Sequence, residues 1–406
     1  MVTITMSSDA NKQVILLVDD TPANIHIAQA ILKDEFRIRV ATSGAKALEL
    51  MKIEPMPALV LLDIEMPGMD GYEVCHQLKA NAQTRDIPVI FLTGKTESED
   101  ETRGFEVGAV DYVHKPFSPM VVKARVRTHL TLRATGEQLA RQLLAINNEL
   151  EMARQIQLSI LPHETPNLRG LDIAARYLPM SSVAGDFYDF IIVDEQHVGI
   201  LIADVSGHGL PAALIASMLQ VSLAAQFAHA SDPGRVLAGL NHALCGKFTR
   251  HFVTAAYVFV DMEMNSMSYA GAGHPPLLLR HGSTGSASEV SKNGLLLGHF
   301  PKEIYSSVQI PVEPDDKAIL YTDGILETSD PSQEMLGVDR FKRFVEGNHD
   351  VGAGQLADSL LDELSRWSGH PKGVGQQDDI TLLVIDFKNL ERSKRGHFLP
   401  ETAELQ

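Results

Sequence analysis

The sequence has few residues of the kinds that mark secreted or nucleic-acid-binding proteins. Its 406 residues include two cysteines, Cys75 and Cys245, and one tryptophan. Two cysteines cannot form a disulfide framework, and the N-terminal residues lack the apolar core of a signal peptide, so we expect a cytoplasmic protein. The chain has 35 basic and 52 acidic residues, a formal net charge of -17. This shortage of positive charge argues against a nucleic-acid partner, because phosphate backbones bind clustered Lys and Arg.

Long hydrophobic runs are also scarce. The segment from Gly209 to Ala228, GLPAALIASMLQVSLAAQFA, carries no charge and approaches the length of a membrane span. It contains Gln220, Gln226 and several serines, and Pro211 lies where its first helical turn would begin. We therefore expect a buried helix and no contact with a membrane; a transmembrane helix is the weaker alternative.

The first third of the chain alternates buried-strand and helix patterns. Apolar runs occupy residues 14–20, 58–67, 87–94 and 109–117, and pieces of helix length separate them. Residues 25–32 have helical spacing. This alternation predicts a doubly wound α/β fold with a parallel sheet, in which functional residues gather at the carboxyl ends of the strands.

Polar residues stand at those strand ends. Asp19 and Asp20 end the first run, Asp63 the second and Thr93 the third, and Lys115 follows the fourth. Three carboxylates in one crevice repel one another, and a hard divalent cation relieves that repulsion. The cation would also neutralise a phosphoryl group at Asp63, with Thr93 donating a hydrogen bond to it and Lys115 pairing with it. Lys115-Pro116 is a candidate cis peptide.

Residues 12–125 thus resemble the receiver domain of two-component response regulators, which has a flavodoxin-like fold. The matching pieces are VDD at 18–20, LLDIEMPGMDG at 61–71, LTG at 92–94 and DYVHKPF at 111–117. The resemblance implies that Asp63 accepts a phosphoryl group from a sensor histidine kinase. It also implies that Asp19, Asp20 and Asp63 hold Mg²⁺, with the Ile64 carbonyl as a further ligand. Tyr112 matches the aromatic residue that changes rotamer on activation, and Thr93 and Lys115 match the other switch residues.

The next segment, residues 126–165, reads as a helical linker, slightly basic between two acidic regions. Its apolar residues mostly recur every three or four positions, the seam of a two-stranded coiled coil, and Gly136 interrupts the pattern. Two interpretations stay open. The helix packs on one of its own domains, or it pairs with a second copy in a parallel homodimer. The seam residues are Leu132, Leu139, Leu143, Ile146, Leu150 and Ala153.

Residues 166–388 show strands first, then helices, then more strands, which predicts an α+β sandwich. Acids again follow apolar runs: Asp186 and Asp189 lie in AGDFYD, Asp204 in DVSGHG, Asp323 in YTDG, and the pair 378–379 in QQDDIT. Oxygen ligands without Cys or His select Mg²⁺ or Mn²⁺ rather than zinc. Two such ions about 4 Å apart activate a water and bind a phosphoryl oxygen, which suits phosphate-ester hydrolysis without a protein nucleophile.

This pattern resembles the metal-dependent PPM-type serine/threonine phosphatases, and more closely their SpoIIE/RsbU-like bacterial branch. The strongest pieces are ARQIQLSILP at 153–162, VAGDFYDF at 183–190, IADVSGHGLPAAL at 202–214, YAGAGHPPLLL at 269–279, LYTDGILE at 320–327 and QDDITLLV at 377–384. The resemblance implies two Mn²⁺ or Mg²⁺ ions. Their implied ligands are Asp186, Asp204, Asp323 and Asp378, the Val205 carbonyl and, ranked second, Asp379.

Other polar residues fit the family less clearly. Arg176 is the nearest arginine to the position from which the eukaryotic branch grips the substrate phosphate. His208 and His274 match family histidines, and His274, between a glycine and a proline, reads as a residue that fixes a turn rather than a general acid. The family often has two glycines before the acid at position 186; here Ala184 precedes Gly185.

The sequence therefore predicts three parts and a polar tail, residues 389–406. The first hypothesis is a response regulator whose output is a phosphatase that dephosphorylates an anti-sigma-factor antagonist under control of Asp63. The alternative is a receiver-regulated binding adaptor with an inactive phosphatase-like domain. Loss of metal-binding carboxylates would indicate the adaptor, and the four expected acids are all present.

Overall fold

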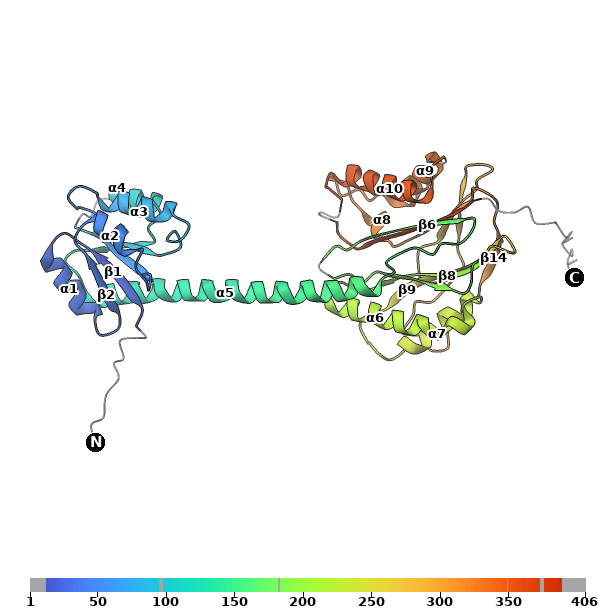
Figure 1. The fold of residues 1–406 in the computed structure, drawn as a ribbon, viewed down its shortest axis with the longest axis horizontal. Helices are drawn as coiled ribbons and strands as arrows, with labels where there is room; N and C mark the ends of the chain where they lie inside the picture. The colour runs from blue at the N-terminus through green and yellow to red at the C-terminus, as the bar shows by residue number, and fades with distance from the viewer. Residues whose placement is uncertain (1–11, 95–97, 182, 349, 373–375, 389–406) are drawn as a thin grey trace, which may run out of the picture. The chain divides into compact units, whose positions relative to one another are not determined.

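The chain folds into two compact units that divide between Ile146 and Asn147 (Figure 1). The computed structural model describes residues 12–94, 98–181, 183–348, 350–372 and 376–388, with the backbone alone at 98–101. The predicted tail, 389–406, lies outside the described residues. Each unit has its own sheets and its own apolar cores.

The N-terminal unit is built on a parallel five-stranded sheet in the order β2-β1-β3-β4-β5. One apolar core joins the sheet to α2 and α3, and a second joins it to α1 and the first turns of α5 (Pro119–Ile160). Helices therefore cover both faces, as the sequence predicted. The elements are β1 (Val14–Val18), α1 (Pro22–Leu32), β2 (Arg37–Ala41), α2 (Gly44–Leu50), β3 (Leu59–Asp63), α3 (Gly71–Ala80), β4 (Val89–Thr93), α4 (Ser98–Glu106) and β5 (Asp111–His114).

Strand β2 is absent from the predicted pattern. Its sequence RIRVA alternates charged and apolar residues, and it lies at the sheet edge, where only one side is paired. A search for continuous apolar runs finds strands buried on both faces and misses an edge strand of this kind.

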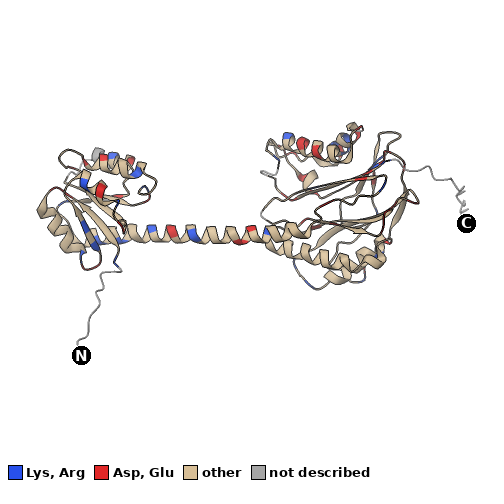
Figure 2. Cartoon of the chain, viewed as in Figure 1, with Lys and Arg blue, Asp and Glu red and all other residues tan. Residues whose placement is uncertain are grey.

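Helix α5 (Pro119–Ile160) runs without a break through Gly136, so the pattern interruption at that glycine does not interrupt the helix. Charged residues of both signs occur along α5 (Figure 2). Several apolar side chains of its middle part are more than half exposed. These are Leu132, Leu139, Leu143, Leu144 and Ile146.

The C-terminal unit is a sandwich of two mainly antiparallel sheets with helices on both outer faces (Figure 1). The first sheet has the order β13-β10-β9-β8-β7, with β14 paired to β10, and the second β12-β11-β15-β16-β6. Its strands are β6 (Leu171–Leu178), β7 (Phe187–Ile192), β8 (His197–Val205), β9 (Val253–Asp261), β10 (Ser266–Ala272), β11 (Leu277–Arg280), β12 (Ala287–Val290), β13 (Asn293–Gly294), β14 (Val308–Pro311), β15 (Lys317–Tyr321) and β16 (Ile380–Phe387). Its helices are α6 (Leu210–Ala224), η2 (Phe227–His229), α7 (Pro233–Leu244), α8 (Gly324–Glu327), α9 (Gly337–Gly347) and α10 (Ala353–Ser368).

Strand β16 shows how the sandwich is packed, because its alternate residues enter different cores. Leu383 and Ile385 pack in the core between the two sheets. Leu382 and Val384 point to the opposite face and pack under α9 and α10. A strand that is buried on both faces reads as a continuous apolar run, which is why ITLLVIDF was recognisable in the sequence.

Most of the segment from Gly209 to Ala228 forms α6, which packs against the first sheet and α7. Among the described residues, no helix has the length and apolar character that crossing a membrane requires. The transmembrane alternative for this segment therefore has no support.

Two candidate acidic sites

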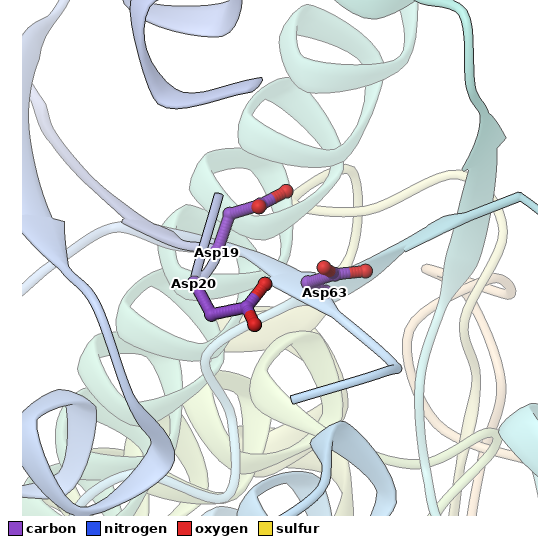
Figure 3. A group of neighbouring side chains, drawn as sticks. All are labelled: Asp19, Asp20 and Asp63. Atoms are coloured by element: carbon purple, nitrogen blue, oxygen red, sulfur yellow. The ribbon is translucent and has the colours of Figure 1, made fainter. Parts of the chain in front are cut away.

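The first site lies at the carboxyl edge of the N-terminal sheet. Asp19 follows β1, Asp63 is the last residue of β3 and Thr93 the last of β4, while Lys115 follows β5. Figure 3 shows the side chains of Asp19, Asp20 and Asp63 gathered at this edge. The parallel sheet brings these residues together because all its strands end on the same side.

The three acids are close enough to share one cation. A carboxylate oxygen from each lies within 4.8 Å of the others; among described residues this is the only such group of three potential ligands. Lys115 Nζ lies 2.8 Å from Asp19 Oδ2 and 2.9 Å from Asp63 Oδ2. Oxygen ligands of this kind fit Mg²⁺.

Burial and charge set the protonation of Asp63. Desolvation raises the pKa of its carboxyl, and the negative charge of Asp19 acts in the same direction, while the Lys115 ammonium opposes both. Asp19 is held by hydrogen bonds to its Oδ1 from the Thr21 amide at 2.9 Å and the Asn24 side chain at 3.0 Å. The site therefore carries more negative charge than one lysine can balance.

A cavity of about 310 Å³ opens over Asp63, and Asp20, Thr93 and Lys115 also line it. Ile64 lines it as well, but its carbonyl accepts the Gly71 amide at 2.9 Å. Its role as a metal ligand stays a prediction. Glu65, next in sequence, lines the same cavity and was not among the predicted residues.

Tyr112 stands apart from that cavity. Its ring contacts those of Phe105 and His114, and the Arg125 guanidinium lies 5.5 Å from its centroid. The peptide bond between Lys115 and Pro116 is cis, as the sequence suggested.

The second site lies in the C-terminal unit, where segments far apart in sequence bring five aspartates to one end of the sandwich. Asp186 precedes β7, Asp204 is the penultimate residue of β8, Asp323 follows β15, and Asp378 and Asp379 precede β16. These aspartates lie close enough for their negative charges to act on one another. Burial, together with the charges of Asp323, Asp378 and Asp379, raises the pKa of Asp204 to about 7.

In the part of the chain that the structure describes, no basic side chain pairs with the four acids Asp186, Asp204, Asp323 and Asp378. Among the described residues, no Lys or Arg nitrogen lies within 4.0 Å of a carboxylate oxygen of Asp186, Asp204, Asp323 or Asp378. A concentration of partly buried carboxylates without cationic partners fits bound divalent metal. No three of these acids are as tightly grouped as those of the first site, so their oxygens are spread over a wider space.

Asp186 is the most deeply buried of these acids. Its Oδ2 accepts hydrogen bonds from Thr322 Oγ1 at 2.8 Å and Thr381 Oγ1 at 2.6 Å. Burial and the Asp204 charge raise its pKa, while the two hydroxyls act in the opposite direction. The sequence analysis missed both threonines. Each is a polar residue in an apolar strand region close to a predicted ligand: Thr322 is next to Asp323, and Thr381 lies two residues after Asp379. That pattern could have identified them.

Asp379 has a different position from its neighbour. Its Oδ1 accepts the Met180 amide and its Oδ2 the Gly185 amide, each at 2.7 Å. Both oxygens are thus engaged by the loop that carries Asp186. Asp379 therefore holds this loop in place, and the roles of Asp378 and Asp379 as metal ligands stay predictions.

Close backbone contacts account for two motif glycines. A Cβ at Gly185 would lie 2.7 Å from the carbonyl oxygen of Val205, the predicted backbone ligand. A Cβ at Gly324 would lie 2.1 Å from the Asp379 carbonyl oxygen. Only glycine permits these approaches, so AGD and TDG bring the acid-bearing segments together.

The end of α5 also holds the Asp186 loop. Gln157 is buried, its Oε1 accepts the Ala184 amide at 3.0 Å, and its Nε2 donates to the Ala184 carbonyl at 2.6 Å. The helix thus satisfies both backbone groups of a residue two positions before Asp186.

The remaining predicted residues do not gather at the acids. Arg176 pairs with Asp358 of α10 through two hydrogen bonds of 2.7 and 2.9 Å, so its guanidinium is used in packing. His274 is buried, its Nδ1 lies 2.9 Å from Thr254 Oγ1, and burial lowers its pKa to about 3. His208 is exposed. Glu327 was missed, although its charge acts on both Asp204 and Asp323.

Comparison with known proteins agrees with both folds. Residues 15–127 match the family model described as a response regulator receiver domain, and residues 194–388 match that of stage II sporulation protein E, SpoIIE. In the N-terminal part the chain is 51% identical over 134 residues to a probable cyclic di-GMP phosphodiesterase of Vibrio cholerae, covering 33% of this chain and 30% of the relative.

The C-terminal part is similar to bacterial phosphatases. The phosphoserine phosphatase RsbU of Bacillus subtilis is 27% identical over 63% of this chain and 73% of its own, and RsbP of the same organism is 30% identical over 60% and 59%. The SiaA-PP2C domain of Pseudomonas aeruginosa superposes with a TM-score of 0.54 at 24% identity, covering 62% of this chain and 98% of that domain, and so shares its fold. The chain spans less than two thirds of some of these relatives. Its N-terminal part nevertheless matches the response regulator receiver family, and its C-terminal part matches the SpoIIE family.

Proposed function

We propose that this protein is a metal-dependent protein serine/threonine phosphatase that responds to phosphorylation of its receiver domain. The observation that carries the proposal is the convergence of Asp186, Asp204, Asp323 and Asp378, which have no Lys or Arg partner among the described residues. All four carboxylates are present, which is what an active enzyme requires and a binding adaptor does not. The similarity to the phosphoserine phosphatases RsbU and RsbP supports the same reaction class.

The four acids and the Val205 carbonyl would hold two Mn²⁺ or Mg²⁺ ions. When bound, such ions would lower the pKa of a metal-bound water and neutralise charge on the phosphoryl group. The residues of this chain orient the ligands: Thr322 and Thr381 fix one oxygen of Asp186. Asp379 fixes the loop on which Asp186 stands.

The test is turnover of p-nitrophenyl phosphate and of a phosphoserine peptide by the full chain with Mn²⁺. Asp204→Asn should abolish turnover, because it removes a ligand charge from the centre of the group. Asp194→Asn is the matched control, since Asp194 is exposed in a turn. Full activity of Asp204→Asn would refute the metal mechanism, and inactivity of the unchanged protein on every phosphoprotein tested would favour the adaptor.

The receiver site supports control by a sensor histidine kinase. Asp63 would accept the phosphoryl group, Asp19 and Asp20 would hold Mg²⁺ beside it, and Thr93 and Lys115 would contact the phosphoryl oxygens. Comparing phosphatase rates with and without a small acyl-phosphate donor tests this coupling. If the phosphatase rates were equal although Asp63 was shown to be phosphorylated, phosphorylation of the receiver would not control the phosphatase.

The substrate proposed is a phosphorylated anti-sigma-factor antagonist. The support is the similarity to RsbU and RsbP over most of the C-terminal part. Dephosphorylation of a panel of such antagonists, compared with unrelated phosphoserine proteins, tests this assignment. Equal rates for the antagonists and the unrelated phosphoserine proteins would agree with a serine/threonine phosphatase. They would refute the proposal that antagonists are its preferred substrates.

A homodimer through α5 is also proposed. Leu139, Leu143 and Ile146 are more than half exposed and follow coiled-coil spacing, so a second α5 would cover them. Leu143→Glu should produce monomers in sedimentation velocity, while Gln142→Glu, at an exposed neighbouring position, should not. If the protein without substitutions were a monomer, the other interpretation, in which the helix packs on one of its own domains, would be favoured.

A further inference from the structure

A row of charged residues crosses the second sheet of the phosphatase domain. The strand registers place Arg280 of β11 beside Lys317 of β15, Lys317 beside Asp386 of β16, and Asp386 beside Asp172 of β6. Residues paired across strands point to the same face of a sheet. The neighbouring row on that face is apolar and packs under α9 and α10; it consists of Leu278, Ile319, Val384 and Ala174.

A cavity of about 470 Å³ lies where the charged row meets the beginning of α10. Arg280, Lys317, Asp386 and Lys388 line it, together with Gly352, the residue that precedes the helix. Helix α10 has 16 residues, and Gly352 offers no side chain to cap its first amides. The positive end of a helix therefore faces this region, which favours an anion.

Arg280 gives the second, independent indication of an anion. Arg280 is 3% exposed; among the described residues its Nε has no hydrogen-bond acceptor, and its guanidinium makes one hydrogen bond, 3.4 Å from an Nη to the Asp315 carbonyl. Within the described ranges, no carboxylate oxygen lies within 4.0 Å of the guanidinium. Lys317 and Lys388, in contrast, lie 2.8 and 2.6 Å from Asp386 and Asp172. A buried guanidinium without a counter-charge is strongly unfavourable, so the cavity lacks one negative group.

Asp386 restricts which anion fits. Among the described residues its buried Oδ2 accepts no hydrogen bond, and the Lys388 ammonium forms a long ion pair with it at 3.5 Å. A ligand must therefore offer acceptor oxygens to Arg280 and a proton to Asp386. Asp315 and Asp350, both exposed, also line the cavity and disfavour an anion of high charge.

We propose that this cavity binds a protonated phosphate group, either inorganic phosphate or the phosphate of a small monoester. The ligand accepts hydrogen bonds from Arg280 and the first amides of α10, and its hydroxyl donates to Asp386 Oδ2. Sulfate is similar in shape but carries no proton at neutral pH, so it cannot satisfy Asp386.

This site is separate from the catalytic acids. Asp379 precedes the first residue of β16 and Asp386 is the seventh residue of that strand. At about 3.3 Å per residue they lie roughly 20 Å apart. Binding at the two places can therefore be measured independently, and the proposal does not depend on the phosphatase activity.

The experiment is calorimetric titration of the full chain carrying Asp204→Asn, which disables the proposed catalytic site. Inorganic phosphate, glycerol 3-phosphate and sulfate are the three ligands. We expect binding of at least one phosphate ligand, and sulfate at least about tenfold weaker. Addition of Arg280→Met should weaken phosphate binding at least about tenfold, whereas Arg235→Met, at an exposed arginine, should not change it.

Thermal unfolding tests whether Arg280→Met loses phosphate binding only because it fails to fold. Phosphate at ten times its Kd should raise the Tm by about 3–6 °C, and Arg280→Met should lose that shift without losing Tm in the absence of phosphate. If Arg280→Met unfolds, Arg280→Lys provides the same comparison with the charge retained.

Three results would overturn the proposal. Absence of binding in the parent would mean that the cavity holds only water. Unchanged binding in Arg280→Met would place the phosphate elsewhere. Sulfate binding as tight as phosphate would remove the role of Asp386, which Asp386→Asn checks directly, because an amide can donate to sulfate.

Discussion

Gln157 offers a sharp test of how α5 acts on the phosphatase site. Its amide binds both backbone groups of Ala184, at 3.0 and 2.6 Å, and both residues are buried. Gln157→Leu keeps the approximate volume and removes both hydrogen bonds. The Ala184 amide and carbonyl would then lose their partners inside the fold.

The expected magnitude follows from those two groups. Each unsatisfied buried polar group costs about 1–3 kcal/mol, so the free energy of unfolding should fall by about 2–6 kcal/mol. We also expect the substitution to displace Asp186 and so to weaken metal binding, because Ala184 lies two residues before Asp186. Loss of a group that positions a metal ligand typically weakens metal affinity by about 10–100-fold.

Two measurements check this prediction, with Gln155→Leu as the control. Gln155 lies on the same helix but is exposed, so its substitution removes an amide without removing these bonds. Urea unfolding gives the stability, and phosphatase rate against Mn²⁺ concentration gives the apparent metal affinity. If Gln157→Leu matched Gln155→Leu in both, the proposed coupling of α5 to the Asp186 loop would be refuted.

The remaining predictions concern the two acidic sites. Thr381→Val should weaken apparent Mn²⁺ affinity by about tenfold, because one hydrogen bond that favours ionised Asp186 is lost; full activity at low Mn²⁺ would contradict it. Since the pKa of Asp204 is raised to about 7, its proton competes with metal: Mn²⁺ affinity in calorimetry should fall as pH decreases from 8 to 6. Metal-free protein should change in the opposite sense, gaining stability over that range because the folded state binds the proton more tightly than the unfolded state; a Tm independent of pH would argue against the shift. Asp63→Asn should abolish labelling by an acyl-phosphate donor, and a gel shift on phosphate-binding acrylamide that persists in this variant would locate the phosphoryl group elsewhere.

The fold was largely accessible from the sequence wherever strands are buried on both faces. β1, β3 and β4 appear as apolar runs, and their terminal acids and Thr93 lie at one edge as expected. β2 was not accessible, because its alternating charges reflect an edge position that depends on the completed sheet. Periodicity reports burial, and an edge strand is buried only in part.

The candidate acids were predictable because each follows a strand, but their supporting contacts were not. Thr322, Thr381 and Gln157 become meaningful only when β15, β16 and the end of α5 come together around the Asp186 loop. Nothing in local spacing indicates that two hydroxyls share one carboxylate oxygen. The same holds for Arg176, whose partner Asp358 is 182 residues away and lies on α10.

The Gln157 contact also decides where this protein can be cut. A fragment that begins at residue 166 lacks Gln157, so the backbone amide and carbonyl of Ala184 lose their hydrogen-bond partner. Low stability or low activity of such a fragment would therefore give no information about the acids themselves. A fragment that begins at Asn147 retains the last turns of α5 and the contact. A fragment made to study the C-terminal domain alone should therefore include those turns of α5. If it does not, a loss of activity caused by the missing Gln157 contact could be taken for the loss of control by the receiver.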